Sequence, residues 1–258
     1  MLNKLLTPWA ETVGENPWQT YPRPQLKRES YVNINGLWNF AVSQTDSQPE
    51  QYDQEILVPF CPESMLGGVE AGDFTGKWLF YKRSFTLRSG FQKDKVLLRI
   101  GAADQIAKVY VNQKAIGTHI GGYEAFSFDI TDALQADNEL VIAVFDDLKD
   151  KSLPYGKQTL TRGGMWYTPV SGIWQTVWME SVPETYVKSL RIENRGGTVT
   201  IDVGDEGISG KVTVAGLGEF ALENGSVTIT PENPNLWSPE NPYLYHFTLE
   251  TESDKVES

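Results

Sequence analysis

The feature that most constrains this 258-residue chain is the stretch Val109–Ile130. Apolar and polar residues alternate there up to a short turn at Asn112–Lys114, and alternate again after the pair Gly121-Gly122. Side chains alternate between the two faces of a strand, and glycine permits backbone paths that other residues resist. The stretch therefore predicts strand, turn, strand, glycine loop and strand, with no room for a helix.

Strand patterns recur along the chain, and no long segment has the helical period. The run 138–145 is apolar on both faces, which predicts a central strand covered on both sides. The sequence therefore predicts an all-β protein. The predicted strands cover residues 37–42, 55–59, 78–87, 95–100, 106–112, 125–130, 139–145, 173–180, 186–193, 198–203, 211–215, 219–222, 226–230 and 243–250.

A break near residue 183 divides these strands into two predicted domains. The first covers 1–183 and opens with a proline-rich, extended arm over residues 1–30, which we expect to lie on a domain surface. The second covers 184–258, where Asn224-Gly225 predicts a hairpin turn and the close spacing of short strands predicts a small sandwich.

Charge and composition exclude several functions. A net charge of −12 repels phosphate backbones and anionic lipids, so we expect no nucleic acid or membrane partner. Cys61 has no second cysteine to pair with, and the N-terminus lacks the apolar run of a signal peptide, so we expect a cytoplasmic location. Two histidines and one cysteine give no metal-ligand spacing, and we expect neither a metal nor another cofactor.

Five blocks, in this order along the chain, resemble glycoside hydrolase family 2. One includes Asn-Gly-Leu-Trp-Asn-Phe, another ends in Arg-Ser-Phe, and a later one reads Ser-Gly-Ile-Trp-Gln-Thr-Val. The resemblance implies a jelly-roll, galactose-binding-like sandwich followed by an immunoglobulin-like sandwich. The blocks cover residues 21–40, 76–85, 109–130, 171–177 and 234–245.

Enzymes of this family, which include β-galactosidases, β-glucuronidases and β-mannosidases, carry two catalytic glutamates on a TIM barrel. A barrel needs about 250 residues of alternating strand and helix, whereas the elements predicted along this chain are strands. The resemblance thus implies non-catalytic N-terminal modules of a longer glycosidase, inactive alone. It also implies that the tail 251–258 leaves the second sandwich one strand short.

The residues themselves predict no catalytic group. Asp146 and Asp147 are adjacent, so their side chains point to opposite faces, and we expect a solvated strand end rather than a catalytic carboxyl pair. Neither His119 nor His246 lies in a nucleophile motif.

The long loop 154–175 is the first candidate for sugar contact, because in family members it reaches the active site. Arg162, Trp166 and Tyr167 are the predicted substrate-binding residues there. Gly164 stands where some β-galactosidases have Asp, which departs from the galactoside pattern. The alternative role of Trp166 and Tyr167 is packing against the barrel.

Asp73 is the second candidate, since some family members carry a substrate-contacting Asn at that place, and a carboxylate accepts hydrogen bonds from sugar hydroxyls. Its alternative role is that of a turn residue. Asn112 and His119 are expected to be structural, Asn112 in its turn and His119 in packing.

Three functions remain open. The first is a module pair that contacts a β-linked glycoside together with a catalytic barrel. The second is a free-standing lectin-like protein, since many jelly rolls bind sugars without catalysis. The third is a dimerisation module, and a homo-oligomer is possible in each case.

Overall fold

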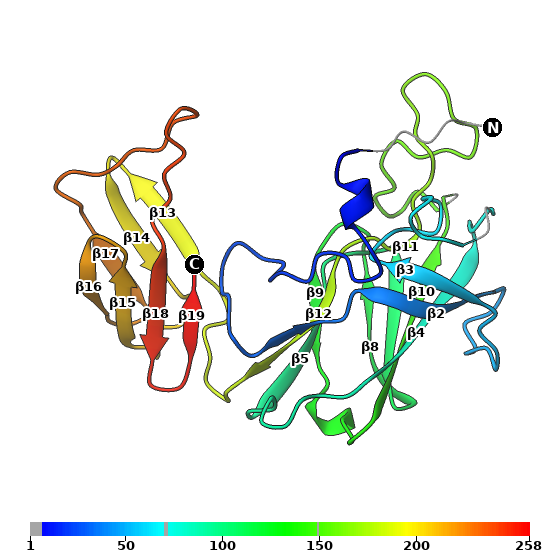
Figure 1. Ribbon diagram of the computed structural model, residues 1–258, viewed down its shortest axis with the longest axis horizontal. Coiled ribbons are helices and arrows are strands. Elements are labelled where there is room, and N and C mark those ends of the chain that lie inside the picture. Colours follow the sequence, from blue (N-terminus) through cyan, green and yellow to red (C-terminus); the bar gives the residue numbers. More distant parts are fainter. Residues whose placement is uncertain (1–6, 70–71, 149) are drawn as a thin grey trace. The chain divides into compact units, whose positions relative to one another are not determined.

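The computed structural model describes residues 7–69, 72–148 and 150–258, which form two compact units (Figure 1). The first unit consists of Met1–Thr20 and Val32–Ser181, and the second of Tyr21–Tyr31 and Val182–Ser258. Residues 1–6 of the expected arm lie outside the described residues. The prediction of an all-β protein is confirmed, because the described helices are two single 3-10 turns, η1 (Ala10–Thr12) and η2 (Thr131–Ala133).

None of the helices in the described ranges is long and apolar enough to cross a membrane.

The described residues of the first unit form a two-stranded sheet of β6 (Ala103–Asp104) and β11 (Gly172–Ile173), and two larger sheets whose inner faces share one apolar core. The larger sheet has six strands, ordered β3 (Gln54–Val58), β2 (Gly36–Ser43), β4 (Lys77–Phe85), β10 (Asn138–Asp146), β7 (Ile106–Val111) and β8 (Lys114–Ile120). The smaller sheet has four strands, ordered β1 (Tyr31–Asn33), β12 (Val177–Val182), β5 (Lys95–Ile100) and β9 (Phe126–Asp129). Trp38 and Ile142 from the larger sheet and Leu98 and Met179 from the smaller one meet in this core.

Strand β10 is central, as its two-sided apolar pattern predicts. It pairs with β4 from Asn138↔Phe85 to Asp146↔Lys77, and with β7 on its other edge. Its residues Leu140, Ile142 and Val144 face the core at the two-residue period of a strand. Asp146 continues the same face, which matters for the site below.

The hairpin in the opening stretch is confirmed. Strands β7 and β8 are antiparallel, and Asn112 and Gln113 join them with φ values of 51° and 66°. Two positive φ angles in a two-residue loop match the twist of the flanking strands. The side-chain amide of Asn112 also donates to the Ala133 carbonyl at 2.8 Å. The His119 ring stacks on the Phe126 ring at 4.0 Å between centroids. Both residues thus have structural contacts, as expected.

The second unit also has two sheets. One has the order β13 (Arg191–Arg195), β14 (Thr198–Asp202) and β17 (Ser226–Ile229), and the other β16 (Gly218–Leu222), β15 (Gly210–Val214), β18 (Phe247–Thr251) and β19 (Lys255–Glu257). Asn224 and Gly225 form the predicted turn with positive φ angles, and Glu223 pairs with Ser226 across it. The strands on either side of this turn then enter different sheets.

One expectation about the chain's N-terminal part needs correction. The tail 251–258 contributes β19, which pairs with β18. Residues 21–31 do not lie on a surface as an extended arm. Leu26 enters the second core, and Lys27 exchanges two 2.9 Å backbone hydrogen bonds with Glu257.

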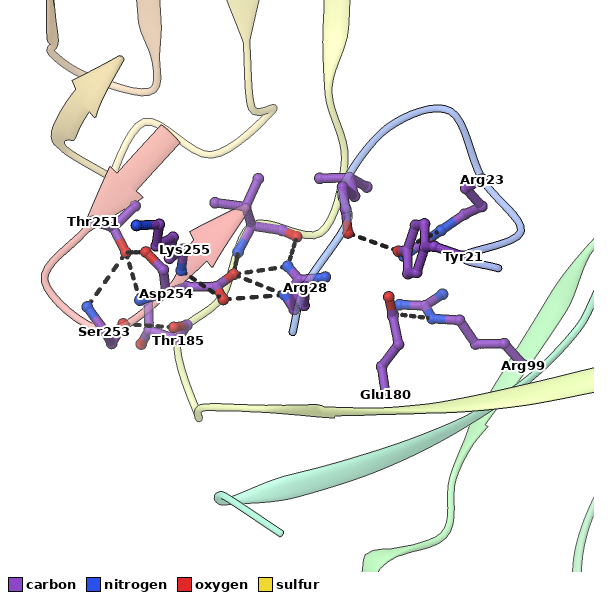
Figure 2. Close-up of polar contacts among 12 residues, drawn as sticks. Tyr21, Arg23, Arg28, Arg99, Glu180, Thr185, Thr251, Ser253, Asp254 and Lys255 are labelled. Atoms are coloured by element: carbon purple, nitrogen blue, oxygen red, sulfur yellow. Dashed lines mark hydrogen bonds and ion pairs between the residues drawn. The ribbon is translucent and has the colours of Figure 1, made fainter. Parts of the chain in front are cut away.

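A buried ion pair explains why this segment joins the second unit. The Arg28 guanidinium donates to the two carboxylate oxygens of Asp254 at 3.0 and 2.7 Å, and to the Val187 carbonyl at 2.7 Å (Figure 2). Asp254 also accepts the Val187 amide at 3.0 Å. Both charged side chains are at most 1% exposed, so each depends on the other.

Three predicted strands differ clearly in extent. The run 186–193 is a strand only from Arg191, where β13 begins. The run 173–180 splits into β11 (Gly172–Ile173) and β12, because Trp174 and Thr176 bond back to the segment before β6 (Ala103–Asp104). The run 243–250 is paired only from Phe247 onward, since the preceding chain is interrupted by prolines, which donate no ladder hydrogen bond.

Candidate functional site

The long loop after β10 is folded back on itself. Tyr167 donates its amide to the Lys157 carbonyl at 2.8 Å and accepts the Thr159 amide at 2.9 Å. The loop ends at the short strand Gly172–Ile173, which pairs with Ala103–Asp104. These backbone bonds give the loop a defined conformation between two fixed ends.

The predicted residues Arg162, Trp166 and Tyr167 lie together in this folded-back part and face solvent. The Trp166 side chain is 42% exposed and the Tyr167 side chain 65%, and Met165 beside them is also exposed. Flat aromatic rings with a polar tip bind both apolar faces and hydroxyls. An exposed group of this kind is typical of a contact surface.

Gln158 holds the base of the loop. Its side-chain oxygen accepts the Val170 amide at 2.6 Å, which ties the start of the loop to its end. Its side-chain nitrogen is 3.3 Å from the Tyr123 hydroxyl and 3.4 Å from Asp104 Oδ2 and donates to both. One amide thus joins three separate segments of the first unit.

Two carboxyls hold the end of the loop at Ser171, directly after Val170. The Ser171 hydroxyl donates to Asp146 Oδ2 at 2.9 Å, and its amide donates to Glu63 Oε2 at 3.1 Å. Asp104 and Asp146 are only 3% and 2% exposed. We call Glu63, Asp104 and Asp146 the carboxyl cluster.

Burial is the main influence on the ionisation of this cluster. It raises the pKa of Asp146 to about 7, with a further contribution from the Asp104 charge. It also raises the pKa of Asp104 to about 6, helped by Glu63 and opposed by the Gln158 hydrogen bond. The pKa of Glu63 is raised by burial as well. Burial and neighbouring like charges both disfavour the ionised carboxyls, so Asp146, with a pKa of about 7, is partly protonated near neutral pH.

Three other titratable groups near the cluster also have raised pKa values. Burial raises the pKa of the Cys61 thiol, of the Tyr123 hydroxyl and, most strongly, of the Tyr81 hydroxyl. The Asp147 charge raises the pKa of Asp146 slightly further.

The two aspartates of the carboxyl cluster are almost inaccessible and bond to Ser171 and Gln158 at the ends of the loop. This corrects the expectation that Asp146 is a solvated strand end. The two-residue period could have revealed it, since Asp146 shares a face with the buried Val144 and Ile142.

Asp73 lies at the same end of β10 as the carboxyl cluster. Its carboxylate accepts the Thr75 amide at 3.0 Å and its carbonyl accepts the Lys77 ammonium at 2.7 Å. Gly76 in the same turn donates to the Asp146 carbonyl at 2.6 Å. These contacts support its alternative role as a turn residue.

Among the described side chains, no three His, Cys, Asp or Glu residues are grouped so that they could bind a metal ion.

Comparison with protein families decides where the chain belongs. Residues 185–258 match the model described as glycosyl hydrolases family 2, and residues 73–160 match the one described as a glycosyl hydrolase 2 galactose-binding domain-like region. The chain belongs to glycoside hydrolase family 2. Its residues correspond to the N-terminal domains of these glycosidases.

Similar family 2 proteins share about a quarter of their aligned residues with this chain. A β-galactosidase of Thermoanaerobacter pseudethanolicus is 26% identical over 66% of this chain and 25% of its own length. A β-glucuronidase of Felis catus is 26% identical over 92% of this chain and 42% of its own length. The chain therefore spans about a quarter to less than half of these relatives.

Solved structures of family 2 enzymes share the fold. A β-glucuronidase from Ruminococcus gnavus, in complex with C6-substituted uronic isofagomine, superposes with a TM-score of 0.68 at 21% identity. The match covers 93% of this chain and 46% of that enzyme.

The family 2 resemblance located the loop but not what holds it. Gln158, Asp104 and Glu63 were missed because their contacts join positions far apart in the sequence, as the 54 positions between Asp104 and Gln158 illustrate. The Gly pair before Tyr123 was one available signal. A Cβ on Gly122 would lie 2.2 Å from Asp104 Oδ1, so this glycine makes room for the carboxyl.

Proposed function

We propose that this chain provides the non-catalytic N-terminal modules of a family 2 glycosidase, and that its loop supplies sugar contacts to an active site completed by a catalytic barrel. The observation that carries the proposal is the exposed pair Trp166 and Tyr167 on a loop with a fixed base. A binding loop fixed in advance loses little conformational entropy when the sugar binds. Arg162 in the same loop and Asp73 in the turn before β4 are the polar candidates.

The relatives support a class of substrate. Those compared above are β-glucuronidases and a β-galactosidase, which supports a β-linked glycoside as the substrate of the whole enzyme. In this arrangement the loop would form part of the wall that distinguishes one sugar from another, since one well-placed polar contact strongly favours the matching substrate.

The reading frame beyond Ser258 tests the main part of the proposal. We expect it to encode alternating strands and helices with two glutamates placed for retaining hydrolysis. The 258-residue chain alone should not hydrolyse nitrophenyl glycosides. A hydrolysis rate that disappears on substitution of one carboxylate would contradict the proposal.

Sugar contact by the loop is tested with the chain itself. Saturation-transfer NMR with a nitrophenyl β-glucuronide and a nitrophenyl β-galactoside should give a weak signal that Trp166→Ala or Tyr167→Ala removes. Trp9→Ala is the matched control, because Trp9 is also exposed and lies outside the loop. An unchanged signal in both loop variants would exclude the contact.

A lectin-like protein is the alternative, and the same exposed aromatic pair favours it. A self-sufficient site should bind an oligosaccharide with a dissociation constant of about 1 µM, which corresponds to about −8 kcal/mol. Calorimetric binding of that strength would support the lectin and contradict a site that needs a barrel.

Assembly and location stay predictions. A homo-oligomer is tested by sedimentation velocity of the chain, and dimers that persist at nanomolar concentration would favour the dimerisation role.

A cytoplasmic location fits the unpaired Cys61 and is tested by fractionation of cells that express the natural gene.

A further inference from the structure

One side chain, that of Gln158, connects the start of the loop to its buried base. Gln158 is bonded at Val170, Tyr123 and Asp104, and Val170 immediately precedes the Ser171 that the carboxyl cluster holds. A displacement of Gln158 would therefore release the start and the end of the loop together.

Its partners are themselves fixed. The Trp174 indole donates to the Gly122 carbonyl at 2.8 Å, and its ring meets the Tyr123 ring edge-on at 6.2 Å between centroids. The missing side chain at Gly122 lets Asp104 Oδ1 approach, and this oxygen has no hydrogen-bond partner among the described residues. Asp104 Oδ2 is left to accept from Gln158.

We propose that Gln158 is the positioning residue of the loop, which fixes Trp166 and Tyr167 in the orientation that meets sugar by joining Val170, Tyr123 and Asp104. This rests on the sugar-contacting role proposed above. A neutral amide suits the place, because it donates to a carboxyl and accepts a backbone amide at once. A glutamate of the same size would still accept from Val170 but would face Asp104 with a second carboxyl.

Hydrogen exchange of the peptide 157–170 tests the positioning directly. In Gln158→Ala, the hydrogen bonds to Val170, Tyr123 and Asp104 are lost, and we expect exchange in this peptide to rise by at least about tenfold. Gln92→Ala, at an exposed glutamine outside the loop, should leave it unchanged. Protection equal to that of the wild type in Gln158→Ala would overturn the inference.

Gln158→Glu separates positioning from space filling, because it keeps the size of the side chain. We expect protection of the peptide at about pH 5.5 and its loss at about pH 8, where the introduced carboxylate would face the carboxyl cluster. A change in protection between the two pH values no larger than that of the wild type would indicate a filler and contradict the inference. If Gln158→Ala fails to fold, Tyr123→Phe removes one partner and should raise exchange less strongly.

The sugar signal distinguishes this inference from the proposed function. Faster exchange together with a lost saturation-transfer signal in Gln158→Ala supports both. Faster exchange with an unchanged sugar signal leaves Gln158 as the anchor of the loop but contradicts the positioning of Trp166 and Tyr167 for sugar, whereas Trp166→Ala and Tyr167→Ala test sugar contact itself.

Discussion

Asp254 in the second unit and Asp146 in the first are equally buried but are accommodated differently. Asp254 accepts three charge-assisted hydrogen bonds from Arg28 and one from the Val187 amide. Asp146 accepts from the Ser171 hydroxyl and has Asp104 and Glu63 as charged neighbours. A buried carboxyl requires either a cation or a proton, and this protein uses each solution once at these two places.

Whether a buried carboxyl pairs with a cation depends on its local partners and not on the unit in which it lies. The first unit also contains an ion pair, in which Arg99 donates to the buried Glu180 at 2.5 Å (Figure 2). Both ion pairs join segments far apart in the sequence, 226 and 81 positions, whereas the carboxyl cluster holds the end of the loop that carries the predicted site. The comparison predicts a joint held by a buried ion pair at Arg28 and a pH-dependent joint at Asp146.

The largest effect is expected from Arg28→Ala. It leaves Asp254 buried without its cation, which costs about 3–5 kcal/mol of unfolding free energy. Hydrogen exchange of β18 and β19 measures this loss. Lys27→Ala is the control, because the Lys27–Glu257 pair is about half exposed and such pairs contribute about 0–1 kcal/mol. Equal losses of unfolding free energy in Arg28→Ala and Lys27→Ala would show that burial of the ion pair does not determine its contribution.

Asp146→Asn is expected to change how stability depends on pH. The folded-state pKa is raised from 3.8 to about 7, so the wild type loses unfolding free energy as pH rises through this interval. The amide cannot ionise, and the variant should therefore gain about 2–4 kcal/mol relative to the wild type between about pH 4 and pH 8. Urea unfolding at a series of pH values gives this difference, and a constant difference would exclude a protonated Asp146.

A smaller loss is expected from Gly122→Ala. The new methyl group would lie 2.2 Å from Asp104 Oδ1, and overpacking of this kind costs about 1–3 kcal/mol. Thermal melting measures it. Gly163→Ala is the matched control in the loop, where a Cβ would meet none of the described atoms within 4 Å. Equal melting temperatures of the two variants would mean that Asp104 does not need the space.

The smallest effect on folding is expected from Tyr167→Ala. The side chain is mostly exposed, so its removal should change the unfolding free energy by no more than about 0.5 kcal/mol. Urea unfolding checks this, and a loss above about 2 kcal/mol would assign the ring to packing instead of ligand contact.

Local rules predicted the strands well, because alternation is a property of neighbouring residues. They identified the central position of β10 and the turn at Asn112–Gln113, and they could have identified the inward face of Asp146. The family resemblance added the identity of the two sandwiches and directed attention to the loop with Trp166 and Tyr167.

The anchors could not be predicted in the same way. Arg28 and Asp254 are 226 positions apart, and Asp104 and Gln158 are 54 apart, so no local pattern relates them. The arm was misplaced for this reason, since the prolines around Arg23 indicate an extended chain but not what it packs against. Buried polar partners become visible only when the fold brings them together.

The titration of the carboxyl cluster tests the central contrast most directly. Carbon-13 NMR of the aspartate carboxyl groups, assigned with Asp146→Asn and Asp104→Asn, measures each midpoint in the folded chain. The account predicts midpoints of about 7 for Asp146 and about 6 for Asp104. Midpoints near 3.8 for both would show that the base of the loop is charged at neutral pH and would contradict the account.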